Sequence, residues 1–366
     1  MRFVYDMAEL APGMGKSMGI YNYAVNLFHH LVPLMAPDWE IHVACNEGCL
    51  ADLTPRQGGA RVQHHVVLPG SQPSSIARQV WMRFGAQALA RRVNAPVYFT
   101  PKGFLPGWSG RPMGLKTVAV LHDLIPLWYE RHVPDQFGWL ERQVVNGGLL
   151  RTGRWADELI VISQATADDL AQHVKRPVPA KVVHNGIPVR AASAERPVAE
   201  PYLFAMASAL PHKNLSGVLA AYARYRALSP APLPLLVCGV EDPGVPGVRA
   251  VRGLSDEALH AHYAHAEAFV FLSLVEGFGF PPLEAMSHGT PVVCSDIAVF
   301  RELTKGAARL VPPDAAEQVA RALMEVTNLS CANRQELADR CKRVSALYDW
   351  GRCASGVHAV LQGMKP

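Results

Sequence analysis

Residues 273–296 read SLVEGFGFPPLEAMSHGTPVVCSD, and this stretch gives the clearest structural signal in the chain. An apolar run ends at Ser273, a Gly-Phe-Gly turn follows at 277–279, and Pro281–Pro282 predicts the first turn of a helix. Gly289 predicts the end of that helix, because glycine commonly follows the last helical residue. The apolar run PVVCSD then begins another strand. Strand, turn, helix and strand in this order indicate a parallel α/β unit.

The turn itself has the features of an anion site. Gly277 and Gly279 allow the backbone to approach a ligand closely, and the N-terminus of the following helix adds positive potential. Two carboxylates, Glu276 and Glu284, flank the turn, and a carboxylate can accept hydrogen bonds from two neighbouring hydroxyls. A diphosphate with diols on both sides, such as a nucleotide sugar, would fit this arrangement.

The same alternation of apolar runs and helix-length segments extends through the whole chain, which predicts an α/β protein with two Rossmann-like, doubly wound parallel sheets facing a cleft. We expect an N-terminal domain over 1–190, a C-terminal domain over 191–349, and a terminal helix at 350–366 that packs back on the first domain. A Pro- and Ala-rich linker at 186–201 separates the two sets of strands. The predicted strands are 2–6, 40–45, 61–68, 95–100, 116–123, 158–163 and 180–185, then 202–208, 234–239, 248–253, 268–273, 291–296 and 308–313.

Composition limits the class of protein. The 366 residues are 49% hydrophobic and 18% charged, which is typical of a well-buried globular protein. No apolar run approaches the ~20 residues of a spanning helix, and no secretory signal pattern opens the chain, so we expect the protein to stay in the cytosol. The seven scattered cysteines favour reduced thiols over disulfides or zinc ligands. The first 190 residues carry 19 Lys and Arg against 14 Asp and Glu, which favours an anionic partner.

The two glutamates, in the setting EGFGFPPLEAM followed by GTPVV, resemble the E-x7-E signature of retaining glycosyltransferases of family 4, which have the two-domain GT-B fold. Other stretches resemble that family in the same order along the chain. They are GIYNYAVNL from Gly19, HDLIP at 122–126, ADELIVIS ending at Ser163, VVHNGI at 182–187 and HKN at 212–214. Together they cover nearly the whole sequence, and the resemblance implies that the N-terminal domain binds the acceptor and the C-terminal domain binds the nucleotide-sugar donor.

The resemblance implies a role for several residues. Lys213 would place an ammonium on the donor diphosphate and offset the charge that grows on the leaving group. Glu276 would bind the hexose hydroxyls and Glu284 the ribose hydroxyls. His122, at the end of a first-domain strand, would face the transferred sugar. The backbone of the turn would contact sugar and phosphate through Gly277, Phe278, Gly279 and Phe280.

The same resemblance places Ser208 and Asn214 beside the donor. Many family members carry an arginine a few residues before the lysine, but this chain has Ala207 and Ser208 in that region. His212 stands beside the lysine, and we expect it to act as a weaker, pH-dependent cation.

The loop APGMGKS at 11–17 looks like a phosphate-binding loop, but Leu10 stands where its first glycine is required. A P-loop ATPase or kinase is therefore the weaker hypothesis. In family-4 glycosyltransferases the corresponding loop lines the cleft, which implies close approach at Gly13, Gly15 and Gly19 and a cation for an anionic acceptor at Lys16.

No metal cofactor is expected. The chain lacks the D-x-D pair that metal-dependent glycosyltransferases use. His260, His262 and His265 do not form a metal site, because the first two lie on opposite faces of the helix that Ser255, Asp256 and Glu257 predict. Retention of configuration in the family implies that the leaving phosphate accepts the acceptor's proton, so no organic cofactor or side-chain nucleophile is needed.

The function we infer is transfer of a hexose, with mannose from GDP-mannose favoured, to a glycan or lipid-linked acceptor of a surface polysaccharide or lipopolysaccharide. A nucleotide-sugar epimerase on the same fold is the alternative. We expect no nucleic-acid partner. Segment 74–93 mixes Arg78, Arg83, Arg91 and Arg92 with aromatic residues, and it either contacts the inner face of an anionic membrane or packs on the core.

Overall fold

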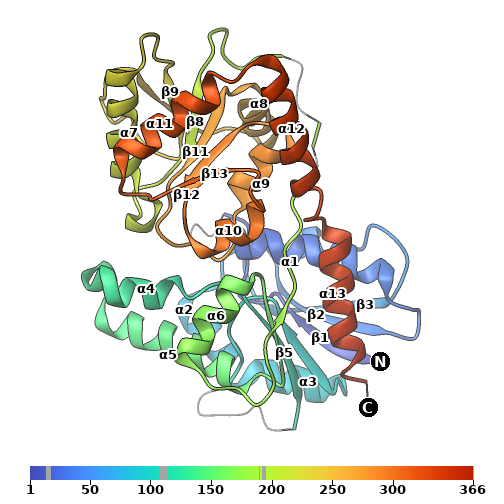
Figure 1. Ribbon diagram of the computed structural model, residues 1–366. Helices are drawn as coiled ribbons and strands as arrows, with labels where there is room; N and C mark the ends of the chain where they lie inside the picture. The colour runs from blue at the N-terminus through green and yellow to red at the C-terminus, as the bar shows by residue number, and fades with distance from the viewer. Residues whose placement is uncertain (14–17, 108–113, 189, 192–194, 366) are drawn as a thin grey trace. The chain divides into compact units, whose positions relative to one another are not determined.

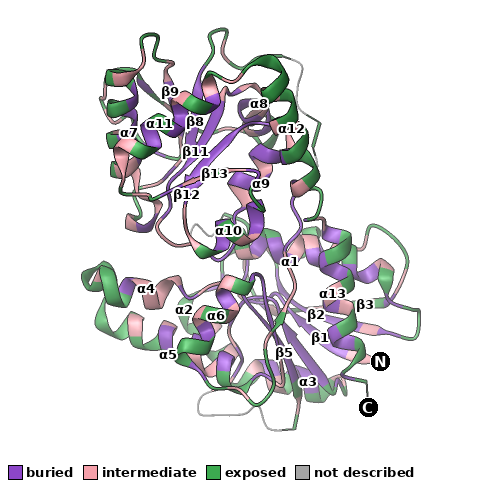
Figure 2. Ribbon diagram, viewed as in Figure 1, coloured by how far each residue is buried: buried purple, intermediate pink, exposed green. Residues whose placement is uncertain are grey.

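In the computed structural model the chain forms two compact units, residues 1–186 with 350–366 and residues 187–349 (Figure 1). The structure describes residues 1–13, 18–107, 114–188, 190–191 and 195–365. Each unit contains one parallel sheet with helices packed on it, as the alternating sequence pattern predicts. In both sheets the central strands are buried and the edge strands are more exposed (Figure 2).

The sheet of the first unit has seven strands in the order β3-β2-β1-β4-β5-β6-β7, and every neighbouring pair is parallel. The strand order reverses between β1 and β4. The loops after these two strands therefore diverge to opposite faces of the sheet and leave room for a ligand. The strands are β1 (Arg2–Asp6), β2 (Glu40–Asn46), β3 (Arg61–Leu68), β4 (Val97–Thr100), β5 (Lys116–Leu121), β6 (Glu158–Val161) and β7 (Lys181–Val182).

The helices of the first unit pack on this sheet. In the first helix Tyr23, Leu27 and Leu31 are buried, and their spacing of four residues places them on one face of the helix. The last helix returns from the second unit's sequence and packs on the first helix. The helices are α1 (Met18–Leu31), α2 (Ser75–Val80), α3 (Ala86–Arg92), α4 (Ile125–His132), α5 (Trp139–Trp155), α6 (Gln164–His173) and α13 (Trp350–Gln362), with a π-helical turn η4 (Trp81–Gly85) joining α2 to α3.

The second unit has a six-stranded parallel sheet in the order β10-β9-β8-β11-β12-β13, with its reversal between β8 and β11. The strands are β8 (Leu203–Met206), β9 (Leu235–Cys238), β10 (Val248–Val251), β11 (Ala268–Phe271), β12 (Val292–Ser295) and β13 (Arg309–Val311). The helices are α7 (Leu215–Leu228), α8 (Asp256–His265), α9 (Phe280–Ser287), α10 (Ala298–Thr304), α11 (Ala316–Thr327) and α12 (Cys331–Ser345).

Every predicted strand is present, although most end one or two residues earlier than their apolar runs. The runs continue past the hydrogen-bonded ladder because the first residues of the following loops are also buried. Leu272 and Ser273 after β11 illustrate this. The helix predicted from the Pro281–Pro282 pair is α9, and Gly289 follows it with φ +82°.

Candidate functional site

The candidate site of the second unit lies at the reversal of its sheet, where the loops after β8 and β11 begin. The short 3-10 helix Pro211–Lys213 carries Lys213, and the loop after β11 carries Glu276. The backbone N–H of Leu274 donates to the carbonyl of His212 at 2.8 Å, which joins the two loops. The predicted lysine and the first predicted glutamate are thus brought together by adjacent strands.

Lys213 and Glu276 form an ion pair in which Nζ and Oε1 are 2.5 Å apart. The lysine side chain is 26% exposed and the glutamate side chain 14%, so a ligand can reach both. The ammonium also lies over the ring of Phe271, 5.5 Å from its centroid, which adds a cation–π interaction. An ammonium held in this way can contact an anionic ligand without first being ordered.

Asn214 holds these loops in place. It adopts a left-handed conformation, φ 52° and ψ 46°, and its side-chain oxygen accepts from the backbone N–H of Gly217 to cap α7. Its amide nitrogen donates to the carbonyls of Leu272 and Pro313, each at 3.1 Å. The side-chain amide is therefore committed to the backbone on three sides, and its contribution at this site is to position Lys213.

The Gly-Phe-Gly turn leads directly into α9. Phe278 is buried and packs its ring near those of Phe280 and Tyr348, with centroids 5.2 and 5.9 Å away. A Cβ atom on Gly279 would lie 3.0 Å from the Phe300 ring. Gly279 has φ −163°, which any residue adopts. Glycine is therefore needed at this position for lack of space beside the Phe300 ring, and not for its backbone conformation.

Glu284 lies within α9 and is partly buried. Burial raises the pKa of this carboxyl to about 7, the hydroxyl of Tyr263 opposes the rise, and the negative charge of Asp256 adds to it. Near neutral pH the group is therefore close to half protonated. A ligand that donates hydrogen bonds to it would favour the ionised form.

His212 does not supply the second cation that we expected from the sequence. The residue is buried, and burial together with the positive charge of Lys213 lowers the pKa of its ring to about 4. The ring is therefore neutral at neutral pH. Ser208 lies nearby in the loop after β8, where its hydroxyl accepts from the backbone N–H of Leu210 at 3.3 Å.

In the first unit His122 follows β5 and is buried. Its Nε2 lies 2.6 Å from the carbonyl oxygen of Pro101, and its ring meets the Tyr23 ring edge-on with centroids 4.7 Å apart. Burial lowers the pKa of His122 to about 4. The ring is thus neutral at neutral pH, and the hydrogen-bonded nitrogen carries its proton.

The residues predicted in the glycine-rich loop are placed only in part. Gly13 has φ +76° and Gly19 lies in the first turn of α1, and a Cβ atom on either would meet no other atom within 4 Å. Gly15 and Lys16 lie outside the described residues.

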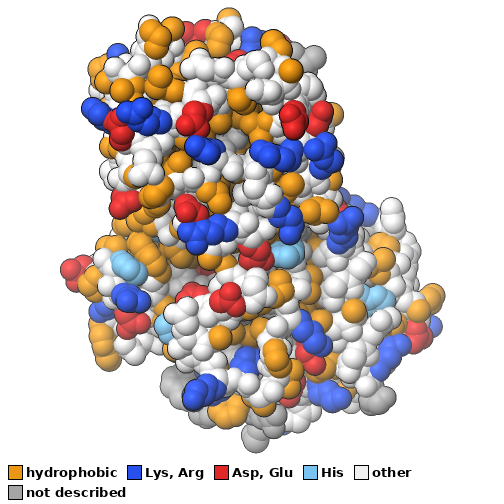
Figure 3. Space-filling model, in the orientation of Figure 1, with side chains coloured by type: hydrophobic (Ala, Val, Ile, Leu, Met, Phe, Trp, Pro, Cys, Tyr) orange, Lys and Arg blue, Asp and Glu red, His pale blue; other side chains and the backbone are white. Residues whose placement is uncertain are grey.

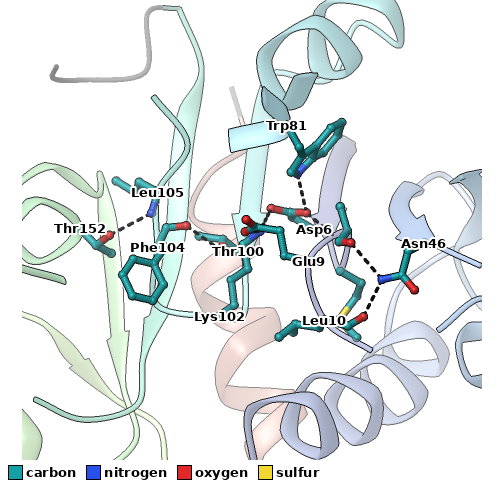
Figure 4. A network of polar contacts seen from close by, with 12 residues as sticks. Asp6, Glu9, Leu10, Asn46, Trp81, Thr100, Lys102, Phe104, Leu105 and Thr152 are labelled. Carbon is teal, nitrogen blue, oxygen red and sulfur yellow. Dashed lines mark hydrogen bonds and ion pairs between the residues drawn. The ribbon is translucent and has the colours of Figure 1, made fainter. Parts of the chain in front are cut away.

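The sequence reasoning missed one cluster entirely (Figure 4). Lys102, just after β4, places Nζ 2.6 Å from Asp6 Oδ2 and 2.5 Å from Glu9 Oε2. Asp6 also accepts from the indole N–H of Trp81 at 3.2 Å and from the backbone N–H of Ala8 at 3.1 Å. The sequence does contain a signal for this cluster: acidic residues stand at the end of one predicted strand, and a lysine follows another.

The histidine-rich run forms α8, capped as predicted by the Ser255 hydroxyl, which accepts from the backbone N–H of Ala258. His260 pairs with His288 at 2.8 Å and His262 with the carbonyl of Ala258 at 2.7 Å. Within the described part of the chain no group of three or more His, Cys, Asp or Glu side chains could hold a metal ion.

Segment 74–93 forms the continuous helix α2–η4–α3. Trp81 packs on the sheet, whereas Ile76, Val80 and Phe84 are exposed at successive helical turns. Among the residues that the structure describes, no helix has the length and apolar character needed to span a bilayer. On the face shown in Figure 3, acidic and basic side chains are interspersed.

Two family models match the chain. The model described as Glycosyltransferase Family 4 matches residues 19–190, and the model described as Glycosyl transferases group 1 matches residues 190–344. Solved structures share the fold. They include WaaG, a glycosyltransferase involved in lipopolysaccharide biosynthesis (16% identity, 99% of this chain and 100% of that one, TM-score 0.68), and Anabaena HepE in complex with UDP and glucose (15% identity, 100% of each chain, TM-score 0.69). The fold is the two-sheet GT-B fold.

Similar sequences include an O-antigen chain mannosyltransferase of Salmonella typhimurium, which is 26% identical over 60% of this chain and 63% of the relative. An MMP α-(1→4)-mannosyltransferase of Mycolicibacterium hassiacum is 28% identical over 68% of this chain and 66% of the relative. The matched region thus spans a little less than two thirds of the length of these relatives.

Proposed function

The chain belongs to glycosyltransferase family 4, and we propose that it transfers a hexose from a nucleotide-diphosphate sugar to a glycan or lipid-linked acceptor in the synthesis of a surface polysaccharide or lipopolysaccharide. Mannose is the favoured sugar, because the similar sequences include an O-antigen chain mannosyltransferase and an MMP mannosyltransferase.

The observation that carries this proposal is the ion pair of Lys213 and Glu276 beside the N-terminus of α9. When the donor's glycosidic bond breaks, negative charge develops on the diphosphate. An ammonium already held in place stabilises that charge without reorganisation. Glu276 keeps the ammonium in place and offers its second oxygen to a sugar hydroxyl, and Glu284 would accept from the ribose.

The proposed reaction retains the configuration at the anomeric carbon and requires no metal ion. Lys213 and the backbone N–H groups at the start of α9 supply positive potential where a metal ion would otherwise act. Incubation with EDTA followed by dialysis should leave the transfer rate unchanged, and the product's anomeric configuration, read by NMR, should match that of the donor.

We further propose that α2–η4–α3 contacts an anionic membrane surface. Ile76, Val80 and Phe84 form an exposed apolar stripe, and the same helix carries Arg78, Arg83, Arg91 and Arg92. An amphipathic helix of this kind binds anionic lipid through both components. Sedimentation with phosphatidylglycerol vesicles should bring down the protein, and Ile76→Ser with Phe84→Ser should leave it in the supernatant.

The decisive experiment pairs a thermal-shift screen of UDP-, GDP- and dTDP-sugars with a transfer assay. A donor at about 100 times its Kd stabilises the folded protein by roughly 2.7 kcal/mol, so the correct donor should raise Tm clearly. The assay then follows radiolabelled hexose from that donor into octyl glycosides. An epimerase would convert the donor without any acceptor, and the absence of both stabilisation and transfer would contradict the proposal.

A further inference from the structure

The cluster formed by Asp6, Glu9 and Lys102 lies at the point of the first unit where a ligand is expected. Its members follow β1 and β4, the two adjacent strands between which the sheet order reverses. The carboxyl ends of strands at such a reversal are the usual ligand-binding edge of a doubly wound sheet. His122 follows β5, the next strand along the same edge.

The cluster has one more negative than positive charge. Asp6 is fully buried and Lys102 is 4% exposed, while Glu9 remains 19% exposed. Asp6 and Glu9 together raise the pKa of Lys102 against the effect of burial, so the lysine stays charged, whereas burial raises the pKa of Glu9. Asp6 alone would neutralise Lys102, so stability does not require Glu9.

The unused hydrogen-bonding groups of the cluster complement each other. The Lys102 ammonium has three N–H groups. Among the described residues only Glu9 accepts a hydrogen bond from them, while Asp6 Oδ2 lies 2.6 Å from the ammonium as an ion-pair partner. Glu9 uses Oε2 for this bond, and its Oε1 accepts from no residue that the structure describes. The cluster thus offers a donor on Lys102 Nζ and an acceptor on Glu9 Oε1, two atoms that belong to the same ion pair. A ligand group that both donates and accepts a hydrogen bond, such as a hydroxyl, suits this arrangement.

We propose that Glu9 and Lys102 bind a hydroxyl group of the acceptor sugar, with Glu9 Oε1 accepting its hydrogen bond and Lys102 Nζ donating to its oxygen. This inference rests on the proposed glycosyltransferase function, in which the first unit binds the acceptor, and it names two residues that would contact that acceptor. Asp6 is then a positioning residue, because it holds the lysine between the two carboxylates with the help of Trp81.

The π-helical turn of η4 supports this arrangement. Trp81 lies inward in this turn and its indole N–H reaches Asp6, while Val80, Arg83 and Phe84 are exposed. A Cβ atom on Gly85 would lie 2.4 Å from the Trp81 ring, so this turn provides the space that the indole needs. Insertions of this type are frequent at functional sites.

The test is Glu9→Ala, which leaves the Asp6–Lys102 pair intact and the buried charges balanced, so the variant should fold. Glu9→Gln is the conservative partner, and Glu47→Ala, at an exposed carboxylate after β2, is the matched control. With the donor chosen by the thermal-shift screen and the best octyl glycoside, acceptor KM should rise about tenfold to a hundredfold in Glu9→Ala. The Kd of the donor should not change, and Glu9→Gln should lie between the two.

The outcomes separate this inference from the function on which it rests. An unchanged acceptor KM in Glu9→Ala, with normal transfer by the unmodified protein, overturns the acceptor site alone. Equal loss of donor affinity and acceptor affinity, with a lower Tm, shows a structural role and also overturns it. If the unmodified protein transfers no hexose to any octyl glycoside, the proposed function fails first.

Discussion

Each unit places a lysine and a glutamate at the reversal of its sheet, but the two pairs differ in burial. In the second unit Lys213 follows the first strand of the reversal and Glu276 the second, and both remain partly exposed. In the first unit Glu9 follows the first strand and Lys102 the second. Lys102 is almost fully buried, and it also pairs with the buried Asp6.

This difference in burial gives the two lysine–glutamate pairs different roles. A partly exposed pair contributes little to stability, typically 0–1 kcal/mol, but its ammonium remains available to a ligand. A buried lysine between two carboxylates is costly to disturb, because removing it leaves charges without compensation. We therefore expect substitutions of Lys213 and Glu276 to change mainly activity, and substitutions at Lys102 to lower stability as well as acceptor binding.

The largest expected effect is on stability at the buried pair. Lys102→Met leaves the buried Asp6 and the partly buried Glu9 together without a cation, so the free energy of unfolding should fall by about 3–5 kcal/mol. Urea titration followed by circular dichroism measures this. Lys116→Met, at an exposed lysine that begins β5, is the control and should stay within about 0.5 kcal/mol of the unmodified protein.

The comparison breaks if Lys213→Met loses as much stability as Lys102→Met. In that case burial does not distinguish the two pairs.

The next largest effect is on catalysis at the exposed pair. Lys213→Ala removes the ammonium that we assign to the leaving diphosphate, so kcat should fall by about 10²–10³ while Tm changes little. Steady-state transfer of the selected sugar measures kcat. Arg343→Ala removes an exposed positive charge from α12 of the same unit and should retain normal kcat.

A double variant sharpens this result. Because Glu276 acts partly through Lys213, Lys213→Ala combined with Glu276→Ala should lose less than the sum of the two single losses. Strict additivity of the two effects would contradict the shared role.

A smaller effect is expected from pH. The pKa of Glu284 is about 7 in the folded protein, against a usual value of 4.5. This group therefore stabilises the free protein most at low pH, and its contribution is lost as pH rises from about 4.5 through 7. Donor binding should show the opposite trend, because ribose hydroxyls favour the carboxylate.

Between pH 6 and pH 8 the Kd of the donor should fall by up to about tenfold, measured by titration of intrinsic fluorescence. Glu284→Gln should bind more weakly at pH 8 and lose this pH dependence. His288 does not titrate in this window, because burial lowers its pKa to about 4. A pH dependence that persists in Glu284→Gln would assign the titration to another group.

The smallest effect should come from Gly279→Ala. The added Cβ would press on the Phe300 ring at 3.0 Å, so unfolding free energy should fall by about 1 kcal/mol. Gly147→Ala in α5 adds the same methyl group with no atom within 4 Å and should be neutral or slightly stabilising. Equal effects on Tm in the two variants would show that the turn has more room than its packing indicates.

The amino-acid sequence by itself determined the two-sheet architecture and the order of its elements. The spacing of apolar residues and the positions of proline and glycine are local properties of the sequence. Apolar runs such as 2–6 and 268–271 form buried strands, and Pro281–Pro282 and Gly289 mark the two ends of α9. The resemblance of local motifs to family 4 also identified Lys213 and Glu276 as candidate donor-site residues from the sequence alone. The roles of these residues at the donor remain predictions.

The tertiary structure alone decided which charges meet and which are buried. Lys102 pairs with Glu9 across 93 residues. The sequence places each residue after a predicted strand, but it does not show that these two strands are neighbours. His212 reads as a cation in the sequence, but its packing makes it neutral, and Asn214 reads as a ligand-binding amide, but its hydrogen bonds go to the backbone. Burial and pairing depend on sheet order, because β1 and β4 become neighbours only once the sheet has formed.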